Sequence, residues 1–269
     1  MRLTINHHVH YRFSTPQSRV VQLLRMTPTD NGSQTVIDWN IGVNCDARLR
    51  HAHDGYGNAT TMLYVDGPID AIELVVSGEV ITEDSKGKVK GTFESLPPLF
   101  FKRSTALTAI DDVVREFAAQ IPDNGLQGAY ALSQLICKTV QASEKRTPKS
   151  RTSSEVLSLG RGSVRDSAHA LIAVARAADF PARLVSGHCL TDANATARRT
   201  SHCWVELHLE DHGWLAFDPS ANCYPGENYV RVATGLDASD STPLSGTRRG
   251  GGIEELDVDI RVAESQTQG

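Results

Sequence analysis

The chain has 269 residues, of which 40% are hydrophobic, 22% charged and 6% aromatic, a composition typical of a globular protein with one large domain or two small ones. Lys and Arg number 27 against 32 Asp and Glu, giving a net charge of −5, and this balance argues against a nucleic-acid-binding protein. No apolar segment approaches the ~20 residues that cross a bilayer, so no membrane partner is expected.

The first residues and the cysteines predict the cellular compartment. The segment MRLTINHHVH has neither a basic region nor an apolar region of a secretory signal. The five cysteines are odd in number, widely spaced and without a CxxC pair, so they do not indicate a disulfide framework. We therefore expect a reduced, cytoplasmic protein.

Residues 1–95 are expected to form an antiparallel β domain. They contain five β-branched-rich runs, MRLTINHHVHYRF, VVQLLRMTP, SQTVIDWNIGV, TTMLYVDG and AIELVVSGEVITED. Turn-forming clusters at residues 27–32, 54–58 and 67–68 separate these runs. Five or six strands without an intervening helix favour a sandwich or a barrel. This half contains no catalytic constellation.

Two histidine pairs in the β domain are candidate metal ligands. His8 and His10, like His51 and His53, alternate along a strand and therefore share one face. Neither pair has a cysteine or carboxylate at ligand spacing, so we expect no metal site.

A linker is expected at residues 96–108, where paired prolines disfavour both a helix and a central strand. Helical spacing of apolar residues then begins at Ile110 and continues over residues 126–142. The basic segment 145–154 lacks aromatic or glycine-rich company, so we interpret it as a solvated connection and not as a phosphate or RNA site. The core domain is expected to span residues 109–235, followed by a tail at 236–269 with a closing strand.

The most informative helix of the core is expected to begin at Ser163 and to stop just before Pro181. Residues 160–162 form a flexible glycine-containing entry, Ser163 can be the N-cap, and Asp166 lies three residues on, as in a capping box. The buried face consists mostly of small residues, which allows another element to pack closely. Strands are then expected at residues 182–189, 201–209 and 214–220.

Alternation of apolar residues predicts the register of the last two of these strands. Their apolar rows share one face only if the turn between them has an odd number of residues. A three-residue turn at 210–212 sets Val205 opposite Phe217 and Leu207 opposite Leu215.

The same register brings a histidine and a carboxylate together. Asp218 lies diagonal to His202 on the face opposite the apolar rows. A carboxylate that orients an imidazole is the base half of a nucleophilic triad. We expect the third member at the N-terminus of the Ser163 helix, where free N–H groups and the helix dipole favour a thiolate.

Two segments carry a family resemblance, GRGSVRDSAHALIAVARAADFPARLVSGH and SHCWVELHLEDHGWLAFDPSANC. They resemble the transglutaminase-like family of bacterial cysteine peptidases, whose motifs run Gly-[Val/Ser]-Cys-x-Asp-x-Ala-[His/Trp], Pro-Ala-Arg-x-Val-Ser-Gly, Ser-His-x-Trp-Val-Glu and Gly-Trp-x-x-Phe-Asp-Pro. The N-terminal strands and the tail segment 244–262 resemble further parts of the same family. The resemblance implies an α+β protein, with an antiparallel β-sandwich-like domain followed by a papain-like core.

The resemblance also implies a Cys–His–Asp triad for acyl transfer at amide bonds, without a metal or another cofactor. His202 takes the place of the catalytic base and Asp218 that of the orienting acid. The nucleophile's position is occupied by Val164, whose side chain cannot form an acyl intermediate.

Three explanations of Val164 stay open. The protein can keep the scaffold and cleft as a binding or regulatory relative or as a disabled copy. A displaced nucleophile, Ser163 or Cys189, can support catalysis instead, whereas strand alternation points Cys203 into the core. Val164 can also be an engineered replacement of a catalytic cysteine.

The resemblance places further residues near the cleft. Trp204, Ser163, Asp166 and His169 match its motifs, and we expect them to line the site or to support it from behind. A peptide or other amide-containing molecule is the expected substrate or ligand. The sequence carries no signal for an oligomeric state or for a choice between hydrolysis and transamidation.

Overall fold

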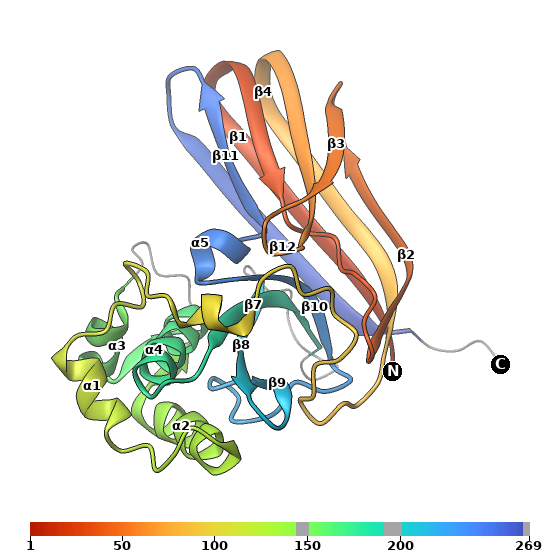
Figure 1. Cartoon of the computed structure of the whole chain (residues 1–269). Coiled ribbons are helices and arrows are strands. Elements are labelled where there is room, and N and C mark those ends of the chain that lie inside the picture. Colours follow the sequence, from red (N-terminus) through yellow and green to blue (C-terminus); the bar gives the residue numbers. More distant parts are fainter. Residues whose placement is uncertain (144–150, 191–200, 266–269) are drawn as a thin grey trace.

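The structure is a computed structural model that describes residues 1–143, 151–190 and 201–265. A tall β-sheet stands beside a lower part in which helices cover a smaller sheet (Figure 1). In chain order the elements are β1 (Arg2–Leu24), β2 (Gln34–Val43), β3 (Arg48–His53), β4 (Ala59–Thr82), a 3-10 helix (Pro98–Lys102), α1 (Asp112–Ala118), α2 (Leu126–Thr139), β5 (Gln141–Ser143), α3 (Ser153–Leu159), β6 (Arg161–Ser163), α4 (Val164–Ala177), β7 (Ala182–Cys189), β8 (His202–Leu209), β9 (Gly213–Phe217), β10 (Tyr229–Gly235), α5 (Ala238–Ser241), β11 (Leu244–Arg249) and β12 (Glu254–Glu264). No helix among the described residues is long and apolar enough to cross a membrane.

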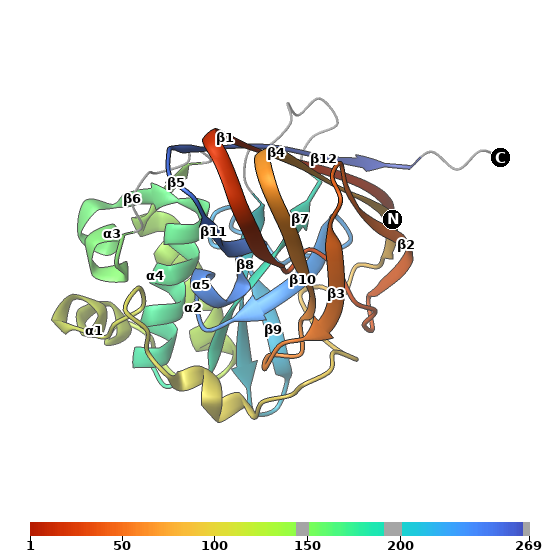
Figure 2. The ribbon, with the colours of Figure 1, turned by 90° about the horizontal axis from the view of Figure 1, so that it is seen from above.

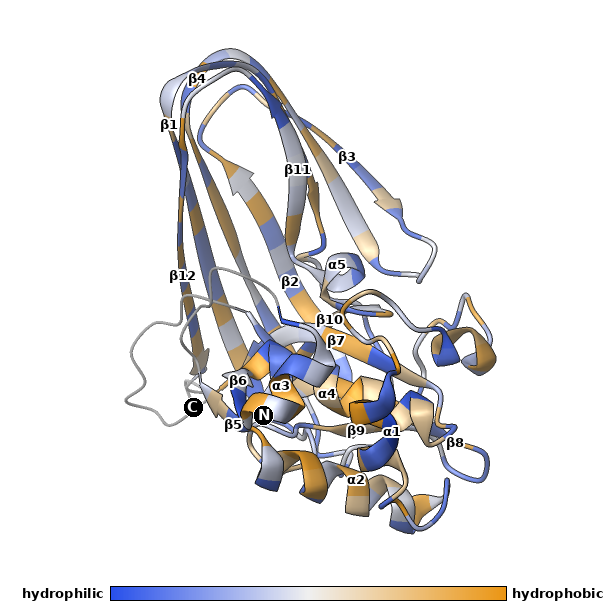
Figure 3. Ribbon diagram, turned by 90° about the vertical axis from the view of Figure 1, so that its left-hand side faces the viewer, coloured by the Kyte–Doolittle hydropathy of each residue, from blue (hydrophilic) through white to orange (hydrophobic). Residues whose placement is uncertain are grey.

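Strands β1 and β4 each unite two runs that the sequence predicts as separate strands. The two strands pair along most of their length, and their register shifts between Arg12 and Gln17 and again before Arg19. Such irregularities bend paired strands without ending them, and both strands bend over at the top of Figure 3. The prediction of a turn at residues 67–68 is therefore wrong, because the chain bends there within β4.

The bend makes a sandwich from a single sheet. In one half, β12 pairs with the first part of β1 and β2 with the second part of β4, and in the other, β11 pairs with the second part of β1 and β3 with the first part of β4. Buried apolar side chains of both halves meet in one cluster, which includes Val9, Tyr11, Val20, Leu63 and Leu74. The predicted β-sandwich-like domain is confirmed.

The C-terminal strands complete this sheet. β11 pairs with β1 from Arg19 to Leu24, and β12 pairs with β1 from Leu3 to Phe13, both in antiparallel orientation. The last described strand therefore closes the sheet that the first strand begins, and β11 adds a strand that the sequence patterns missed.

Helix α4 is the centre of the second part. It lies among α1, α2 and α3 on one side of the β7–β10 sheet (Figure 2), and its side chains from Ala168 to Ala175 are fully buried. Small side chains let β8 and the other helices approach it closely, as predicted. The predicted flexible entry to this helix is wrong, because residues 161–163 form β6, which pairs with β5.

The basic segment predicted at 145–154 falls mostly outside the described residues, and its last residues begin α3, capped by Thr152. The two sheets meet through an apolar cluster that includes Leu3, Ile5 and Val230. Asn58 adds polar contacts, because its amide donates to the Thr234 carbonyl at 2.7 Å and its carbonyl accepts from the Thr234 N–H at 2.8 Å. This docking fixes the long sheet against the outer strand of the core sheet.

Candidate functional site

The β8–β9 hairpin has the predicted register. Val205 pairs with Phe217 and Leu207 with Leu215, with a three-residue turn between Leu209 and Gly213. The apolar side chains of both strands join the α4 cluster. Because side chains alternate along a strand, His202 belongs to the opposite row, together with Trp204.

His202 and Asp218 form a short hydrogen-bonded pair. The distance between His202 Nε2 and Asp218 Oδ2 is 2.6 Å, and the two side chains are 7% and 0% exposed. The bond fixes the orientation of the ring, so Nδ1 is the nitrogen that Asp218 does not hold. This is the histidine–carboxylate contact that the hairpin register predicted.

Asp218 has further partners that the sequence analysis did not identify, and these are Ser220, Tyr229 and the Ala221 N–H, which donates to Oδ1 at 3.3 Å. Its Oδ1 accepts from the backbone N–H and hydroxyl of Ser220 at 2.9 and 2.6 Å, and its Oδ2 accepts from the Tyr229 hydroxyl at 2.8 Å. Burial alone would raise the pKa of Asp218, but the hydrogen bond and charge of His202, with the Ser220 and Tyr229 hydrogen bonds, lower it. Asp218 is therefore held as a carboxylate.

Two aromatic rings flank His202. Its ring centroid lies 5.7 Å from that of Tyr229 and 6.3 Å from that of Trp204. The tip of Trp204 covers Gly187, where an added Cβ would lie 2.7 Å from Trp204 Cη2. Trp204 is thus a wall beside the imidazole, as the resemblance implies, and Gly187 makes room for it.

The start of α4 has the predicted cap, and its first residue is a valine. The Ser163 hydroxyl accepts from the Asp166 N–H at 3.1 Å, and the Asp166 carboxylate accepts from the Ser163 N–H at 2.9 Å, which is the predicted capping box. Arg151 Nη1 lies 3.7 Å from the same carboxylate. Val164, the first residue of the helix, is half-buried and packs against the α4 cluster.

Cys203 follows His202 in β8, and its side chain is buried. Its thiol is buried within the α4 cluster, and burial raises its pKa to about 12. The negative charges of Asp218 and Asp166 also raise this pKa, whereas the positive charge of Arg165 lowers it. The thiol faces the core as predicted, and its raised pKa makes it a poor nucleophile.

Two other cysteines lie on the dyad side of the sheet. Cys189 packs in a cluster with Trp204 and Tyr229, and its sulfur is 3.5 Å from the Leu190 carbonyl oxygen. Cys223, which the sequence analysis did not single out, has its sulfur 3.3 Å from the Tyr229 hydroxyl, and burial raises its pKa. Both thiols are therefore close to the groups that support the His–Asp pair.

Comparison with known families agrees with this geometry. Residues 112–219 match the transglutaminase-like superfamily, and residues 3–81 match the bacterial transglutaminase-like N-terminal region. The chain belongs to the transglutaminase-like superfamily. Both His202 and Asp218 fall within the matched core.

Two individual proteins are similar over nearly the whole transglutaminase-like chain. An uncharacterized protein of Mycobacterium leprae is 25% identical, with 97% of this chain and 98% of that protein covered. A solved structure from Cytophaga hutchinsonii, named a "putative cysteine protease", matches with a TM-score of 0.78 at 18% identity and covers 100% of this chain and 92% of its own. The second match shows that the fold is shared.

His169 is buried in α4 of the transglutaminase-like core. Its Nε2 accepts from the Ala238 N–H at 3.1 Å, and burial lowers its pKa to about 4. Among the described residues, no hydrogen bond joins it to His202 or Asp218. His169 therefore anchors α5 to α4 as a neutral acceptor.

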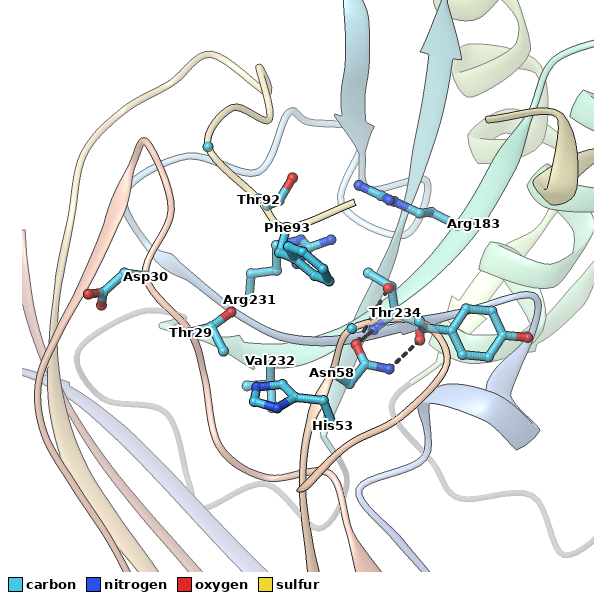
Figure 4. Close-up of a pocket in the computed structure, with 13 residues that line it drawn as sticks. Thr29, Asp30, His53, Asn58, Thr92, Phe93, Arg183, Arg231, Val232 and Thr234 are labelled. Carbon is cyan, nitrogen blue, oxygen red and sulfur yellow. Dashed lines mark hydrogen bonds between the residues drawn. The ribbon is translucent and has the colours of Figure 1, made fainter. Parts of the chain in front are cut away.

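A pocket of about 370 Å³ lies where the long sheet meets the transglutaminase-like core (Figure 4). Its lining includes His53, Asn58, Phe93, Arg183 and Arg231, and it contains neither His202 nor Asp218. Gly187 is the strand neighbour of His202 on one side and of Arg231 on the other. Two strand spacings, about 10 Å, therefore separate the backbone of Arg231, which lines the pocket, from the backbone of His202.

The two arginines of this pocket are already neutralised. The fully buried Glu206 accepts from Arg183 at 2.6 Å and from Arg231 at 2.9 Å, and Glu94 adds a second carboxylate to Arg183. Burial would raise the pKa of Glu206, but Arg231 and Arg183 lower it to about 2. The network holds β7, β8 and β10 together and leaves no excess of buried positive charge.

Proposed function

We propose that this transglutaminase-like protein binds a peptide or another amide-containing molecule without forming a covalent intermediate. The observation that carries the proposal is the combination of Val164 at the start of α4, in the position where the family motif has cysteine, with an intact His202–Asp218 pair. An alkyl side chain has no lone pair to attack a carbonyl. Loss of the nucleophile from a serine-protease triad lowers turnover by about 10⁶.

The contacts of two candidate substitutes support the same proposal. The Ser163 hydroxyl serves as the acceptor of the helix cap, which competes with a role as nucleophile. The Cys203 thiol is buried, with its pKa raised to about 12. The Ser163 hydroxyl is therefore engaged in the cap, and the Cys203 thiol is neither ionised nor exposed, as a nucleophilic thiolate must be.

The retained dyad suits recognition of an amide. The His202–Asp218 pair and the Ser163 cap are polar, whereas Val164 and Trp204 are apolar, and a peptide group beside a side chain presents the same mixture. We propose a cytoplasmic location, supported by five cysteines that form no disulfide with one another, and propose neither nucleic acid nor membrane as a partner.

Turnover and active-site labelling test the proposal. The unaltered protein and His202→Ala are incubated with a panel of peptide amides and with an acylating probe, and adducts are located by peptide-resolved mass spectrometry. We expect no turnover above the His202→Ala background and no adduct near the dyad. Turnover by the unaltered protein that His202→Ala abolishes would overturn the proposal.

One observation favours a second candidate, an amide acyl-transferase or peptidase with a displaced nucleophile. Cys189 packs against Trp204 and Tyr229, the rings that flank His202. An adduct on Cys189 or Ser163 that disappears in His202→Ala would identify this activity. A natural gene with cysteine at position 164 would instead support the third explanation, in which Val164 replaced a catalytic cysteine.

A further inference from the structure

We propose that His8, His10 and Glu73 form a Zn²⁺ site on the outer face of the β-sandwich, independent of the His202–Asp218 site. One ligand atom from each of the three residues lies within 4.8 Å of the others. His10 Nε2 is 3.6 Å from Glu73 Oε1. Within the described residues, no other set of three or more His, Cys, Asp and Glu side chains is this close.

The strand register creates this cluster. His8 and His10 are two residues apart in β1 and point to the same side of the sheet, opposite to the buried Val9. Glu73 of β4 pairs directly with His10. The carboxylate comes from 63 residues further along the chain, which explains why no ligand spacing is visible in the sequence.

The donor set suits zinc. Two imidazole nitrogens and one carboxylate oxygen occur together in zinc sites that keep a position for water. Bond lengths of about 2.0–2.2 Å place two ligand atoms of a tetrahedral zinc ion about 3.4 Å apart. His10 and Glu73 already have nearly this separation, and the side chains of these two residues are 39% and 37% exposed, so small side-chain rotations complete the set.

The strand on the other side of β1 adds negative charge. In the register of β12, Asp257 lies opposite His10 and Asp259 lies opposite His8. Asp259 also accepts from Arg261 at 3.2 Å, so the surroundings are acidic but partly balanced. An imidazole and carboxylate set favours zinc and its transition-metal neighbours over magnesium or calcium, which prefer oxygen ligands alone.

A bound ion would clamp the two longest strands together. β1 and β4 contribute to both halves of the sandwich, and the His10–Glu73 pair lies just before the bend. Because a ligand that binds only the folded state stabilises it, zinc should raise the melting temperature of the protein.

The test uses the full-length chain without a polyhistidine tag. Zinc binding is measured by competition with a chromophoric chelator, and thermal unfolding is followed with and without zinc. We expect one zinc ion per chain and a higher melting temperature with zinc. We expect an affinity at least about 100-fold lower in H8Q/H10Q and at least about 10-fold lower in Glu73→Gln.

The chain offers a matched control. His51 and His53 have the same spacing in β3, but their partners in β4 are Thr61 and Ala59, which provide no carboxylate. The H51Q/H53Q variant should bind zinc as the unaltered protein does. Failure of the unaltered protein to bind zinc at micromolar concentration, or unchanged binding by H8Q/H10Q, would overturn the proposal.

Discussion

The end of the β8–β9 hairpin and the start of α4 both hold buried polar groups, but these groups differ in what they do. At the hairpin, Asp218 accepts hydrogen bonds from His202, Ser220 and Tyr229, and all of them orient or ionise a pair with acid–base chemistry. At α4, the polar contacts of Ser163 and Asp166 are made mainly to each other and satisfy the helix end. Val164, which lies between them in the sequence, has no polar atom in its side chain.

The difference teaches that the two halves of such a site are retained for unequal reasons. Valine at a half-buried helix start fills a volume close to that of cysteine, so the fold tolerates the change. Loss of Asp218 would instead remove the carboxylate that accepts hydrogen bonds from the buried His202 and Tyr229. Retention of the dyad alone therefore does not show that it catalyses a reaction.

The largest expected effect is a difference in the free energy of unfolding between variants at Asp218 and variants at Val164. Asp218→Ala should lower the free energy of unfolding by about 3–4 kcal/mol, because it breaks a buried hydrogen-bonded pair, whereas Val164→Ala should lower it by less than about 1 kcal/mol. Urea unfolding at pH 7.5 measures both, and Asp218→Asn, which keeps the shape and one acceptor, should fall between them. Equal losses for Asp218→Ala and Val164→Ala would remove the contrast.

The next effect concerns pH and the middle of α4. The pKa of His169 is lowered to about 4 by burial, against about 6.5 in an unfolded chain. Below pH 6.5 the unfolded state therefore binds a proton that the folded state does not, and stability is lost as the pH falls toward 4. His169 alone should lower the free energy of unfolding by about 2 kcal/mol between pH 7 and pH 5.

Unfolding in urea at these two pH values measures this loss, with His169→Gln as the control. Glutamine keeps an acceptor near the Ala238 N–H but does not titrate, so its loss over the same interval should be smaller by about that amount. The same pH dependence in both proteins would show that His169 is not held neutral by the fold.

The smallest effect concerns the cap of α4. Ser163→Ala should destabilise the protein by about 1 kcal/mol, and Ser163→Thr should retain most of the stability, because a hydroxyl at the N-cap accepts from the Asp166 N–H. Thermal unfolding measures the stability of the unaltered protein, Ser163→Ala and Ser163→Thr. No difference between Ser163→Ala and the unaltered protein would free the Ser163 hydroxyl for another role, including that of a nucleophile.

Local sequence patterns were sufficient to predict the contact between His202 and Asp218 and the start of α4. The apolar rows of β8 and β9 fix the register that places Asp218 beside His202, because a slip of one residue would bury the polar face. The capping pair of Ser163 and Asp166 likewise marks the start of α4 within three residues of sequence.

Contacts between distant segments were not predictable in this way. Tyr229 reaches Asp218 from β10, and Glu73 reaches His10 from β4, through pairings that no local period specifies. The runs within β1 and β4 were predicted as separate strands because Pro and Gly usually end strands, whereas here both long strands bend at matching positions.

The most direct test is the alkylation rate of Val164→Cys with iodoacetamide between pH 5 and pH 9, read at residue 164 by mass spectrometry. We predict a thiol pKa well below 8.5, from the α4 N-terminus and His202. At pH 6 the rate should be at least ten-fold faster than in Val164→Cys/His202→Ala. A profile with an ordinary thiol pKa and no dependence on His202 would contradict a dyad facing the start of α4.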